Sequence, residues 1–404
     1  MVEEGYKKTE IGVIPVEWEV VKLGDFCDIL DNKRVPLSSE QRATIKGNIP
    51  YYGANGVVDY INDFLFDEEL VLLAEDGGNF SEYETRPIAY MIDGKSWVNN
   101  HTHILRAKNN QNHFLFYNLV HKNIMAFING GTRAKLNRGE LVKIKIPLPP
   151  LKEQEKIADI LCSADDKIDA IVSQIEKAET LKKGLLQKLL SEGIGHSEFK
   201  DSELGKIPVG WEVVELGKVS KIKDGTHFSP KSKTGSFKYV TSKNIKFGYF
   251  DENKISYISE EEHNEIYKRC PVKKGQLLLT KDGAKTGNVC LNPLDEPFSL
   301  LSSVSVIDGK KDSLYNEYLL QWFLSELGQK RLKSSMAGQA ITRLTLTKIS
   351  AHKLIFPPLK EQKQIAEILS TSDEKLEVLR DKKQKYETLK KGLLQKLLSG
   401  EIRV

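Results

Sequence analysis

Two stretches of this chain are rich in Asn, His, Arg, Lys, Ser and Thr, whose side chains hydrogen-bond readily to bases and phosphates. Asn, Gln and Arg can bind base edges through paired hydrogen bonds, whereas Lys, Ser and Thr mainly contact phosphates. The candidates in the first stretch are Asn48, Tyr51, Tyr52, Asn55, Asn99, Asn100, His101, His103, Arg133, Lys135 and Arg138. Those in the second are Thr226, His227, Ser229, Lys231, Lys243, Asn244, Lys281, Lys285, Gln339 and Arg343. A solvated turn is the simpler interpretation of any one of them, so the hypothesis of DNA contact rests on the clusters.

No motif in the sequence predicts catalysis. Residues 291–298 (LNPLDEPF) resemble the Asn-Pro-Pro-aromatic motif of amino-methyltransferases, but Leu294 replaces the second proline and no glycine-rich cofactor loop follows a strand upstream. The segments 281–287 (KDGAKTG) and 74–78 (AEDGG) lack the spacing of a phosphate-binding loop and are typical of tight turns. We therefore predict no catalytic residue and no cofactor in this chain.

A metal site is not predicted either. His101 and His103 alternate along a possible strand and could point their imidazoles the same way, but no third ligand stands nearby in the sequence. The four cysteines are far apart and form no CxxC pair, which favours a reducing compartment over a disulfide framework or structural zinc. No apolar run approaches the ~20 residues of a membrane span, and the N-terminus lacks a signal-peptide core. We expect a cytoplasmic protein that does not bind membranes.

A long repeat follows each polar stretch. Residues 149–191 and 357–399 align without a gap, 208 residues apart, and 179–191 recur letter for letter as 387–399. Each copy begins after two prolines and continues through good helix formers, which predicts one helix of about forty residues and roughly 60 Å. The apolar residues follow the heptad spacing of a coiled-coil seam. The seam residues are Ile157, Leu161, Ile168, Ile171, Ile175, Ile365, Leu369, Leu376, Leu379 and Tyr386.

The seam also indicates what each long helix packs against. Ser372 and Lys383 interrupt its second copy, and a narrow seam with polar interruptions suits two helices paired in one register. The simplest partner of each long helix is the other one; the alternative is two unrelated surface helices, each packed on its own domain. Gly184 and Gly392 lie in the identical blocks, where a helical glycine costs roughly 1 kcal/mol. We interpret them as points of close backbone approach or bending, or as weak points left by a duplication.

A second repeat precedes each polar stretch. Residues 6–26 match 199–219, which lie 193 residues later, and both carry IPxxW before an alternating EVVxLG strand. The regions that follow, 20–147 and 212–355, barely resemble each other in sequence, yet both consist of short predicted strands broken by turns. The polar segment 192–212 is expected to connect the two halves. The frame of the two halves is therefore shared, and their contents differ.

This order predicts an α+β protein. We expect two β-rich domains of similar fold, each with one helix at a matching position (113–128 and 315–332), joined by two long helices that form an antiparallel coiled coil with pseudo-two-fold symmetry. The predicted segments are an N-terminal domain over 1–148, a long helix over 149–192, a linker and C-terminal domain over 193–356, and a second long helix over 357–404.

The charge of the chain is modest. The net charge is +4; residues 20–147 hold 15 Lys/Arg and 15 Asp/Glu, whereas residues 212–355 hold 23 Lys/Arg and 16 Asp/Glu. A protein that binds DNA by phosphate neutralisation alone is usually more basic throughout. We therefore expect partner proteins to supply part of the electrostatic contact.

Several motifs together carry a resemblance to a known family. They are IPVEW and IPVGW ahead of the two variable regions, PPLKEQ after each, and the duplicated LKKGLLQKLL. The stretches 51–56 (YYGANG), 99–103 (NNHTH) and 224–230 (DGTHFSP) are also typical of that family's target-recognition domains. With these motifs, the chain resembles the specificity subunit of type I restriction–modification systems over essentially its whole length.

The resemblance implies two target-recognition domains, each reading one half of an interrupted DNA site. It implies that the paired helices set the length of the unread spacer and dock two modification subunits, which bind S-adenosylmethionine and methylate adenine. Restriction subunits then join for ATP-dependent translocation and cleavage, so S-adenosylmethionine, ATP and Mg²⁺ are expected on partner subunits and this chain is expected to be non-catalytic. From the residues, two other interpretations stay open: a self-contained DNA methyltransferase or nuclease, and a coiled-coil adaptor that binds protein.

Overall fold

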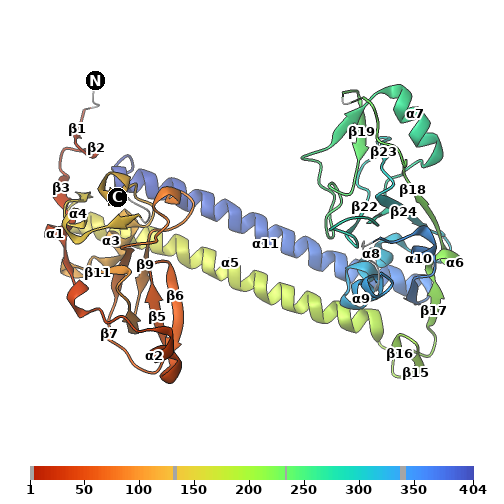
Figure 1. The fold of residues 1–404 in the computed structure, drawn as a ribbon, viewed down its shortest axis with the longest axis horizontal. Helices are drawn as coiled ribbons and strands as arrows, with labels where there is room; N and C mark the ends of the chain where they lie inside the picture. The colour runs from red at the N-terminus through yellow and green to blue at the C-terminus, as the bar shows by residue number, and fades with distance from the viewer. Residues whose placement is uncertain (1–3, 131–133, 233, 337–342) are drawn as a thin grey trace. The chain divides into compact units, whose positions relative to one another are not determined.

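The computed structural model describes residues 4–130, 134–232, 234–336 and 343–404. They form two compact units that divide both long helices between them: unit 1 is residues 1–172 with 381–404, and unit 2 is residues 173–380. Each unit contains one β-rich domain and a part of each long helix (Figure 1).

The two long helices begin directly after the paired prolines. They are α5 (Leu151–Ser191) and α11 (Leu359–Ser399). Just beyond their last residues, Gly193 and Gly400 have φ of 69° and 74°, the left-handed conformation that ends many helices and that glycine adopts without strain. In the described part of the chain, no helix has an apolar stretch long enough to cross a membrane.

Within each unit the two helices run antiparallel. In unit 2, Arg380 Nη2 lies 2.6 Å from Glu179 Oε1, and Lys182 pairs with Asp373. Residue numbers therefore rise along α5 as they fall along α11. In unit 1 the last turns of α11 share a core with the first turns of α5. The predicted antiparallel pairing of the long helices is confirmed.

The predicted seam faces the interior of each unit. Ile157 and Leu161 join the core of unit 1 together with Leu397, and Ile365 and Leu369 join the core of unit 2. The buried seam residues are Ile157, Leu161, Ile171, Ile365, Leu369, Leu376 and Leu379, and the half-buried ones are Ile168, Ile175 and Tyr386.

The glycines in the identical blocks have no close neighbour. A Cβ added to Gly184 or Gly392 would meet no atom of the described residues within 4 Å. The expectation that another segment of this chain approaches the backbone closely there is therefore wrong. Both helices continue through their glycines.

The repeated lead-in folds as a β-hairpin in each unit. The hairpins are β1 (Tyr6–Thr9) with β2 (Gly12–Pro15) and β15 (Phe199–Ser202) with β16 (Gly205–Pro208). Each return strand starts at a glycine with positive φ, 121° at Gly12 and 104° at Gly205, where a larger residue would be strained. After each hairpin the tryptophan of the IPxxW segment, Trp18 or Trp211, is fully buried. The expected connector over 192–212 thus contains an ordered hairpin.

The β-rich domain of unit 1 is built from short strands. They are β3 (Glu19–Lys22), β4 (Cys27–Ile29), β5 (Lys46–Gly53), β6 (Gly56–Ile61), β7 (Phe66–Asp67), β8 (Leu70–Ala74), β9 (Ala89–Ile92), β10 (Lys95–Val98), β11 (Thr102–Ala107), β12 (Ile128–Asn129), β13 (Lys135–Leu136) and β14 (Lys145–Leu148). The core sheet has the order β4-β11-β8-β9, and a second sheet has the order β6-β5-β10-β7. The strand β8 is buried along its whole length because both its faces are covered.

The β-rich domain of unit 2 repeats this plan. Its strands are β17 (Glu212–Glu215), β18 (Ser220–Asp224), β19 (Phe237–Val240), β20 (Ser256–Ile258), β21 (Leu277–Thr280), β22 (Val289–Leu291), β23 (Ser299–Leu300), β24 (Val304–Gly309) and β25 (Lys353–Phe356). The core sheet has the order β18-β24-β21-β22, and the second sheet has the order β20-β19-β23. The prediction of two β-rich domains of similar fold in an α+β protein is confirmed.

Short helices complete both domains. They are α1 (Leu23–Phe26), α2 (Ser39–Thr44), α3 (Asn112–Leu119) and α4 (Arg138–Leu141) in unit 1, and α6 (Leu216–Val219), α7 (Glu260–Arg269), α8 (Asn316–Leu324), α9 (Glu326–Ser334) and α10 (Leu346–Ser350) in unit 2. The helix expected over 113–128 ends at Leu119. The one expected over 315–332 is broken at Ser325, whose side chain accepts a hydrogen bond from Gly328 N at 3.0 Å and caps α9.

Candidate nucleic-acid interface

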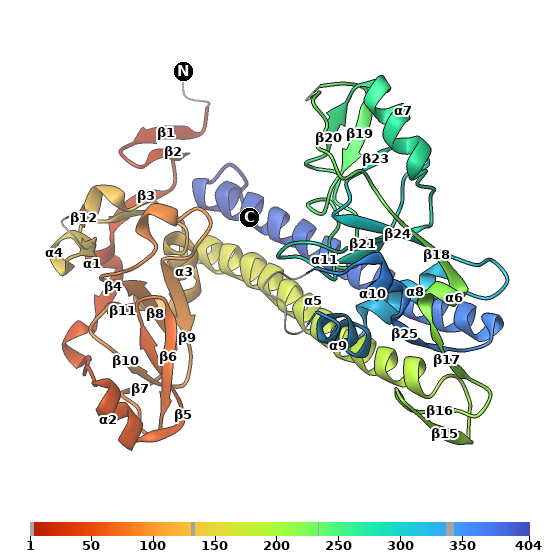
Figure 2. The same ribbon diagram turned by 45° about the vertical axis from the view of Figure 1, so that its right-hand side comes forward.

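Four chain segments meet at one edge of the core sheet of unit 1, the sheet that contains β4, β11, β8 and β9 in Figure 2. The first segment (residues 30–34) follows β4, and the second (75–78) follows β8. The third (99–101) precedes β11, and the fourth includes β13. Backbone hydrogen bonds join them: Glu75 N donates to His101 O at 2.9 Å, and Leu136 N donates to Glu75 O at 2.7 Å. We call this set of segments the loop edge of unit 1.

The loop edge of unit 2 is built in the same way from residues 225–231, 281–287, 301–303 and 343–344. Lys281 N donates to Ser303 O at 2.8 Å, and Leu344 N donates to Lys281 O at 2.8 Å. These bonds reproduce the pattern around Glu75, although the sequences of the segments differ. The scaffold of both loop edges is therefore the same.

A buried charge network supports the loop edge of unit 1. The side chain of His103 is 1% exposed, and its Nδ1 lies 2.6 Å from Asp31 Oδ2. Arg34 pairs with Glu75, and Lys135 Nζ lies 3.0 Å from the other oxygen of Glu75. The paired charges thereby connect segments 30–34 and 75–78 to β11 and β13 and hold them in one arrangement.

This network is occupied by protein charges rather than arranged for a metal ion. Asp31, Glu75 and His103 each have a possible ligand atom, and these atoms lie within 4.8 Å of one another. Both ring nitrogens of His103 already have a protein partner, however, because Nδ1 faces Asp31 and Nε2 lies 2.8 Å from Leu136 O. Burial raises the pKa of Asp31, but the hydrogen bond from His103 and the charge of Arg34 hold it below its ordinary value.

His101 lies apart from this network. Its Nδ1 donates to Asp76 Oδ1 at 2.7 Å, and its side chain is 39% exposed. The expectation that the imidazoles of His101 and His103 point the same way is wrong, because β11 begins at Thr102 and His101 belongs to the preceding turn. Next to it, Asn55 Nδ2 donates to Gly77 O at 2.9 Å. The exposed rim of the loop edge thus presents amide and imidazole groups on a fixed base.

A different charge network supports the loop edge of unit 2. Lys281 is 2% exposed, and its Nζ lies 3.2 Å from Asp224 Oδ2. Arg269 Nη2 lies 3.6 Å from the other oxygen of Asp224. Arg343, which is exposed, reaches Asp282 Oδ1 with its Nε at 3.1 Å. A buried cation therefore stands where unit 1 has the carboxylate of Glu75.

Of the acidic residues in the two networks, sequence reasoning singled out only Asp224, within the 224–230 motif, and missed Asp31 and Glu75. Asp31 and Asp224 end or follow equivalent strands and are 193 residues apart, the same offset as the lead-in repeat. Extending that repeat by a few residues would have identified both. Glu75 and its partner Arg34 are separated by 41 residues, and no local pattern connects them.

The predicted contact residues fall into four groups. Exposed ones are Asn48, Asn55, Asn100, Arg138, His227, Ser229, Lys231, Lys243, Lys285 and Arg343. Half-buried ones are Tyr52, His101 and Lys135. Buried ones are Tyr51, Asn99, His103, Thr226, Asn244 and Lys281. Arg133 and Gln339 lie outside the described residues.

The buried group corrects the sequence-based prediction. An enclosed side chain whose polar atoms already have partners within the protein cannot also reach a base or a phosphate. Tyr51 OH, for example, accepts from Leu37 N at 3.0 Å, and Asn244 Oδ1 accepts from Thr241 N at 3.0 Å. These residues shape the loops, and the exposed and half-buried groups are the ones available for contact.

Cys162 lies beside a histidine, the neighbour that activates nucleophilic cysteines in many enzymes. Cys162 Sγ lies 3.2 Å from His113 Nδ1, and His113 Nε2 lies 3.1 Å from Glu69 Oε2. Burial and the nearby charge of Asp165 raise the pKa of the Cys162 thiol above its ordinary value. A raised pKa favours the neutral thiol over the thiolate that nucleophilic catalysis needs.

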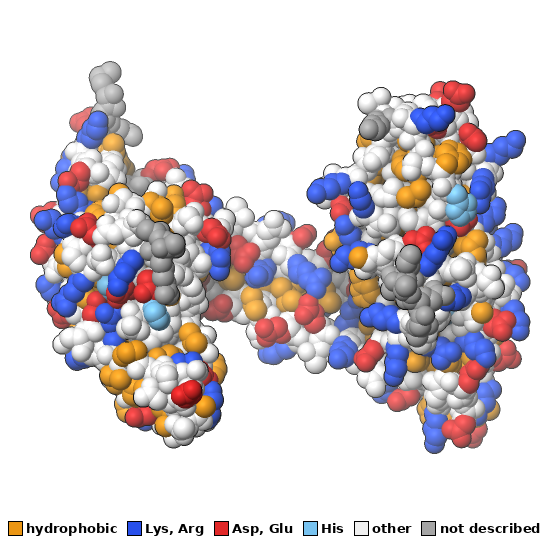
Figure 3. All heavy atoms as spheres, viewed as in Figure 1, with side chains coloured by type: hydrophobic (Ala, Val, Ile, Leu, Met, Phe, Trp, Pro, Cys, Tyr) orange, Lys and Arg blue, Asp and Glu red, His pale blue; other side chains and the backbone are white. Residues whose placement is uncertain are grey.

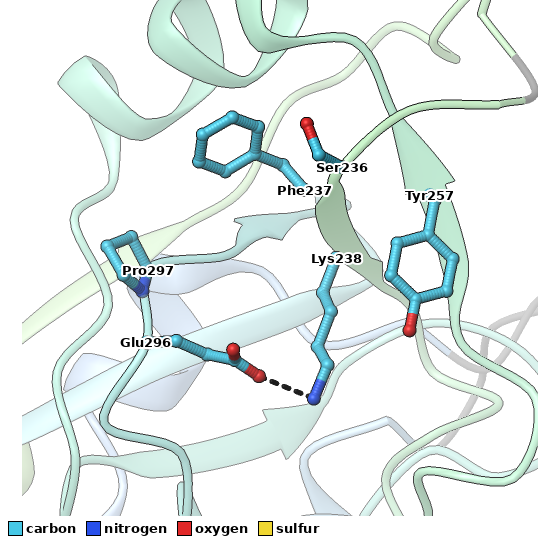
Figure 4. Close-up of a pocket in the computed structure, with 6 residues that line it drawn as sticks. All are labelled: Ser236, Phe237, Lys238, Tyr257, Glu296 and Pro297. Carbon is cyan, nitrogen blue, oxygen red and sulfur yellow. Dashed lines mark ion pairs between the residues drawn. The ribbon is translucent and has the colours of Figure 1, made fainter.

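One face of both units carries mixed charge. Basic and acidic side chains are interspersed on the face shown in Figure 3. A shallow pocket in unit 2 contains Lys238, whose Nζ lies 2.5 Å from Glu296 Oε1 (Figure 4). The same Nζ lies 2.7 Å from Glu252 Oε2. Because two carboxylates neutralise this lysine, the pocket is not arranged to bind a phosphate.

Comparison with known proteins gives consistent results. The model of the type I restriction–modification DNA specificity domain matches residues 15–180 and 208–388. The type I restriction enzyme MjaVIII specificity subunit of Methanocaldococcus jannaschii is 30% identical over 424 residues, covering 100% of this chain and 97% of that protein. A putative type I restriction enzyme specificity subunit of Haemophilus influenzae is 32% identical over 357 residues, covering 88% of this chain and 86% of that protein.

Solved structures support the fold. The S subunit of a type I restriction–modification system from M. genitalium superposes with a TM-score of 0.64 at 17% identity, over 94% of this chain and 96% of that one. A chain from a structural study of the assembly of a type I restriction–modification complex gives a TM-score of 0.52 at 16% identity, over 96% of this chain and 99% of that one.

Proposed function

Because this chain belongs to the type I restriction–modification DNA specificity family, we propose that each of its β-rich domains reads one half of a bipartite DNA site through its loop edge. In this proposal the paired long helices set the length of the unread spacer and dock two adenine methyltransferase subunits. Specificity then lies in this chain and chemistry in its partners.

One observation carries the proposal: the two loop edges share a backbone scaffold but differ in the side chains that they expose. Asn55, Asn100 and His101 line the rim in unit 1, whereas His227, Lys285 and Arg343 belong to the rim in unit 2. Amide and imidazole groups suit base edges, and exposed cations suit guanine or phosphate oxygens. Two rims with different chemistry on one scaffold are what two different half-sites require.

The partners supply the cofactors in this proposal. The methyltransferase subunits bind S-adenosylmethionine, and restriction subunits, which join the complex for translocation and cleavage, bind ATP and Mg²⁺. Because the charge of this chain is modest, partner subunits that close around the DNA also provide phosphate contacts. Because the proposal places S-adenosylmethionine on the methyltransferase subunits, titration calorimetry of the isolated chain with this cofactor should detect no binding.

Domain exchange tests the division of labour between the two loop edges. Replacing residues 20–147 with the corresponding domain of another family member should change one half-site and leave the other half-site and the spacer unchanged. Methylome sequencing of a host that expresses the variant with its modification subunits gives the result. Loss of recognition at both halves would contradict independent reading.

Lengthening one long helix tests the spacer. Four residues inserted into α5 extend it by about 6 Å, so the spacer should change while both half-sites stay the same. The same sequencing experiment reads out both properties. An altered half-site with an unchanged spacer would count against the role of the helices.

A further inference from the structure

Asp165 of α5 joins three elements in unit 1. It accepts a hydrogen bond from Tyr117 OH of α3 at 2.8 Å and pairs with Lys390 of α11. The ammonium of Lys390 also lies 5.6 Å from the centre of the Tyr117 ring. The Lys390 and Asp165 side chains are only 22% and 33% exposed, so water screens this pair less than a surface pair. The contact ties a helix of the β-rich domain to both long helices.

Asp373 of α11 makes the equivalent contacts in unit 2. It accepts a hydrogen bond from Gln321 Nε2 of α8 at 3.0 Å and pairs with Lys182 of α5. The Lys182 side chain is 18% exposed. Here too one carboxylate connects a domain helix to both long helices.

We call the contacts of Asp165 with Tyr117 and Lys390 the joint of unit 1, and those of Asp373 with Gln321 and Lys182 the joint of unit 2. The two joints are built from equivalent positions. Asp165 and Asp373 are 208 residues apart, as are Lys182 and Lys390, which lie in the identical blocks. The domain helices α3 and α8 both begin with an asparagine, and their contributions, Tyr117 and Gln321, are each the sixth residue of the helix. The donors differ, but the carboxylate and the lysine are the same in both units.

These joints supply information that the apolar seam lacks. The apolar residues of a heptad seam look similar after a shift of seven residues, so by themselves they specify the register of two helices weakly. Such a shift moves one helix by about 10 Å, which corresponds to roughly three base pairs of DNA. A single Asp–Lys pair at a fixed place on each helix is lost by any shift.

We propose that Asp165 and Asp373 are the positioning residues that fix the spacer of the bipartite site, because each sets both the helix register and the attachment of one β-rich domain to the helices. The inference rests on the proposed function and adds to it the residues that determine spacing. It assigns half-site reading to the loop edges and spacer selection to these two joints.

Charge exchange in the assembled complex tests this. The complex with modification subunits is assayed for methylation of duplexes whose half-sites are separated by the native spacer or by a spacer up to three base pairs shorter or longer. Asp373→Lys places a second cation against Lys182. This variant should lower the preference for the native spacer by about tenfold. The double variant Lys182→Asp with Asp373→Lys should restore most of it, since the pair is re-formed and Gln321 can accept from the new lysine through its oxygen.

Two further variants make the result decisive. Lys396→Asp is the control, because it reverses a charge on α11 that does not pair with α5. The Lys396 Nζ lies 2.8 Å from Glu401 Oε1. This variant should leave the spacer preference unchanged. If Asp373→Lys shows no cooperative thermal unfolding and is therefore not folded, Asp373→Asn takes its place. This variant removes the charge of the side chain while keeping its shape. A folded variant at Asp373 with wild-type spacer preference overturns the inference. A wild-type complex that methylates no bipartite site refutes the proposed function itself.

Discussion

The indole Nε1 of Trp18 donates a hydrogen bond to Glu153 Oε2 at 2.9 Å. The equivalent tryptophan in unit 2, Trp211, donates to Glu361 at 2.8 Å. The IPxxW and PPLKEQ repeats, which are far apart in the sequence, therefore meet in each unit. Their contact connects the lead-in hairpin to the start of a long helix. In unit 1, Arg403 also donates to this glutamate, with its Nε 2.7 Å from Glu153 Oε1.

Glu153→Gln should lower the free energy of unfolding at pH 7 by about 1–3 kcal/mol, because the variant leaves Arg403 without its buried anionic partner. Burial raises the pKa of Glu153, but Arg403 and Trp18 hold it below its ordinary value. A carboxyl with a lowered pKa stabilises the fold above its unfolded pKa, so the difference between variant and wild type should shrink as the pH falls through that range. Urea unfolding measures it, with exposed Glu155→Gln as the control; equal losses in both variants would contradict the prediction.

Gly184→Ala and Gly392→Ala should each stabilise the chain by up to about 1 kcal/mol. Alanine is the better helix former, and a Cβ at either position meets nothing within 4 Å among the described residues. Thermal unfolding should show a higher midpoint for each variant. Gly193→Ala is the contrasting change and should destabilise, because its φ is 69° and a Cβ would lie 2.4 Å from the ring of Trp211. A lower midpoint for Gly184→Ala would show a constraint that this chain alone does not explain.

Acid should weaken unit 2 through His352. Burial, together with the charge of Arg331, lowers the pKa of His352 to about 4, and its Nε2 accepts a hydrogen bond from Trp322 Nε1 at 3.1 Å. The unfolded chain takes up this proton near pH 6.5, so stability is complete above that pH and falls by up to about 3 kcal/mol as the pH drops toward 4. His352→Gln keeps an acceptor for Trp322 but does not titrate. Its urea-unfolding free energy should therefore depend less on pH between 7 and 4.5 than that of the wild type, and identical slopes would refute the assignment.

His101→Ala should relax base preference at one position of a single half-site. With Nδ1 donating to Asp76, the ring is held in place and Nε2 is left for a base contact. Loss of one such contact reduces discrimination by about 1–3 kcal/mol. Methylation mapping in the assembled complex reads it out. Arg343→Ala on the other loop edge is the matched variant, and changes at the same half-site from both variants would contradict separate reading.

The helices and their pairing were accessible from the sequence because their determinants are local and periodic. Paired prolines, a heptad seam and a gapless repeat each act over a few turns, and they predicted α5 and α11 to within a few residues of their ends. The lead-in repeat was equally clear, although its folding as a hairpin was not predicted. The breaks after Leu119 and at Ser325 were missed because apolar spacing continues beyond the points where these helices end.

The contact residues were predicted less well because residue type does not specify burial. His103 and Lys281 were chosen for their chemistry, yet each lies inside a charge network whose other members come from strands far along the chain. By itself, the sequence determined the duplicated frame, the two long helices and the regions that vary, since these depend on short-range pattern. Only the tertiary structure decided which polar side chains reach the surface and which carboxylates hold the joints, because ion pairs such as Asp165–Lys390 form between positions that no local spacing relates.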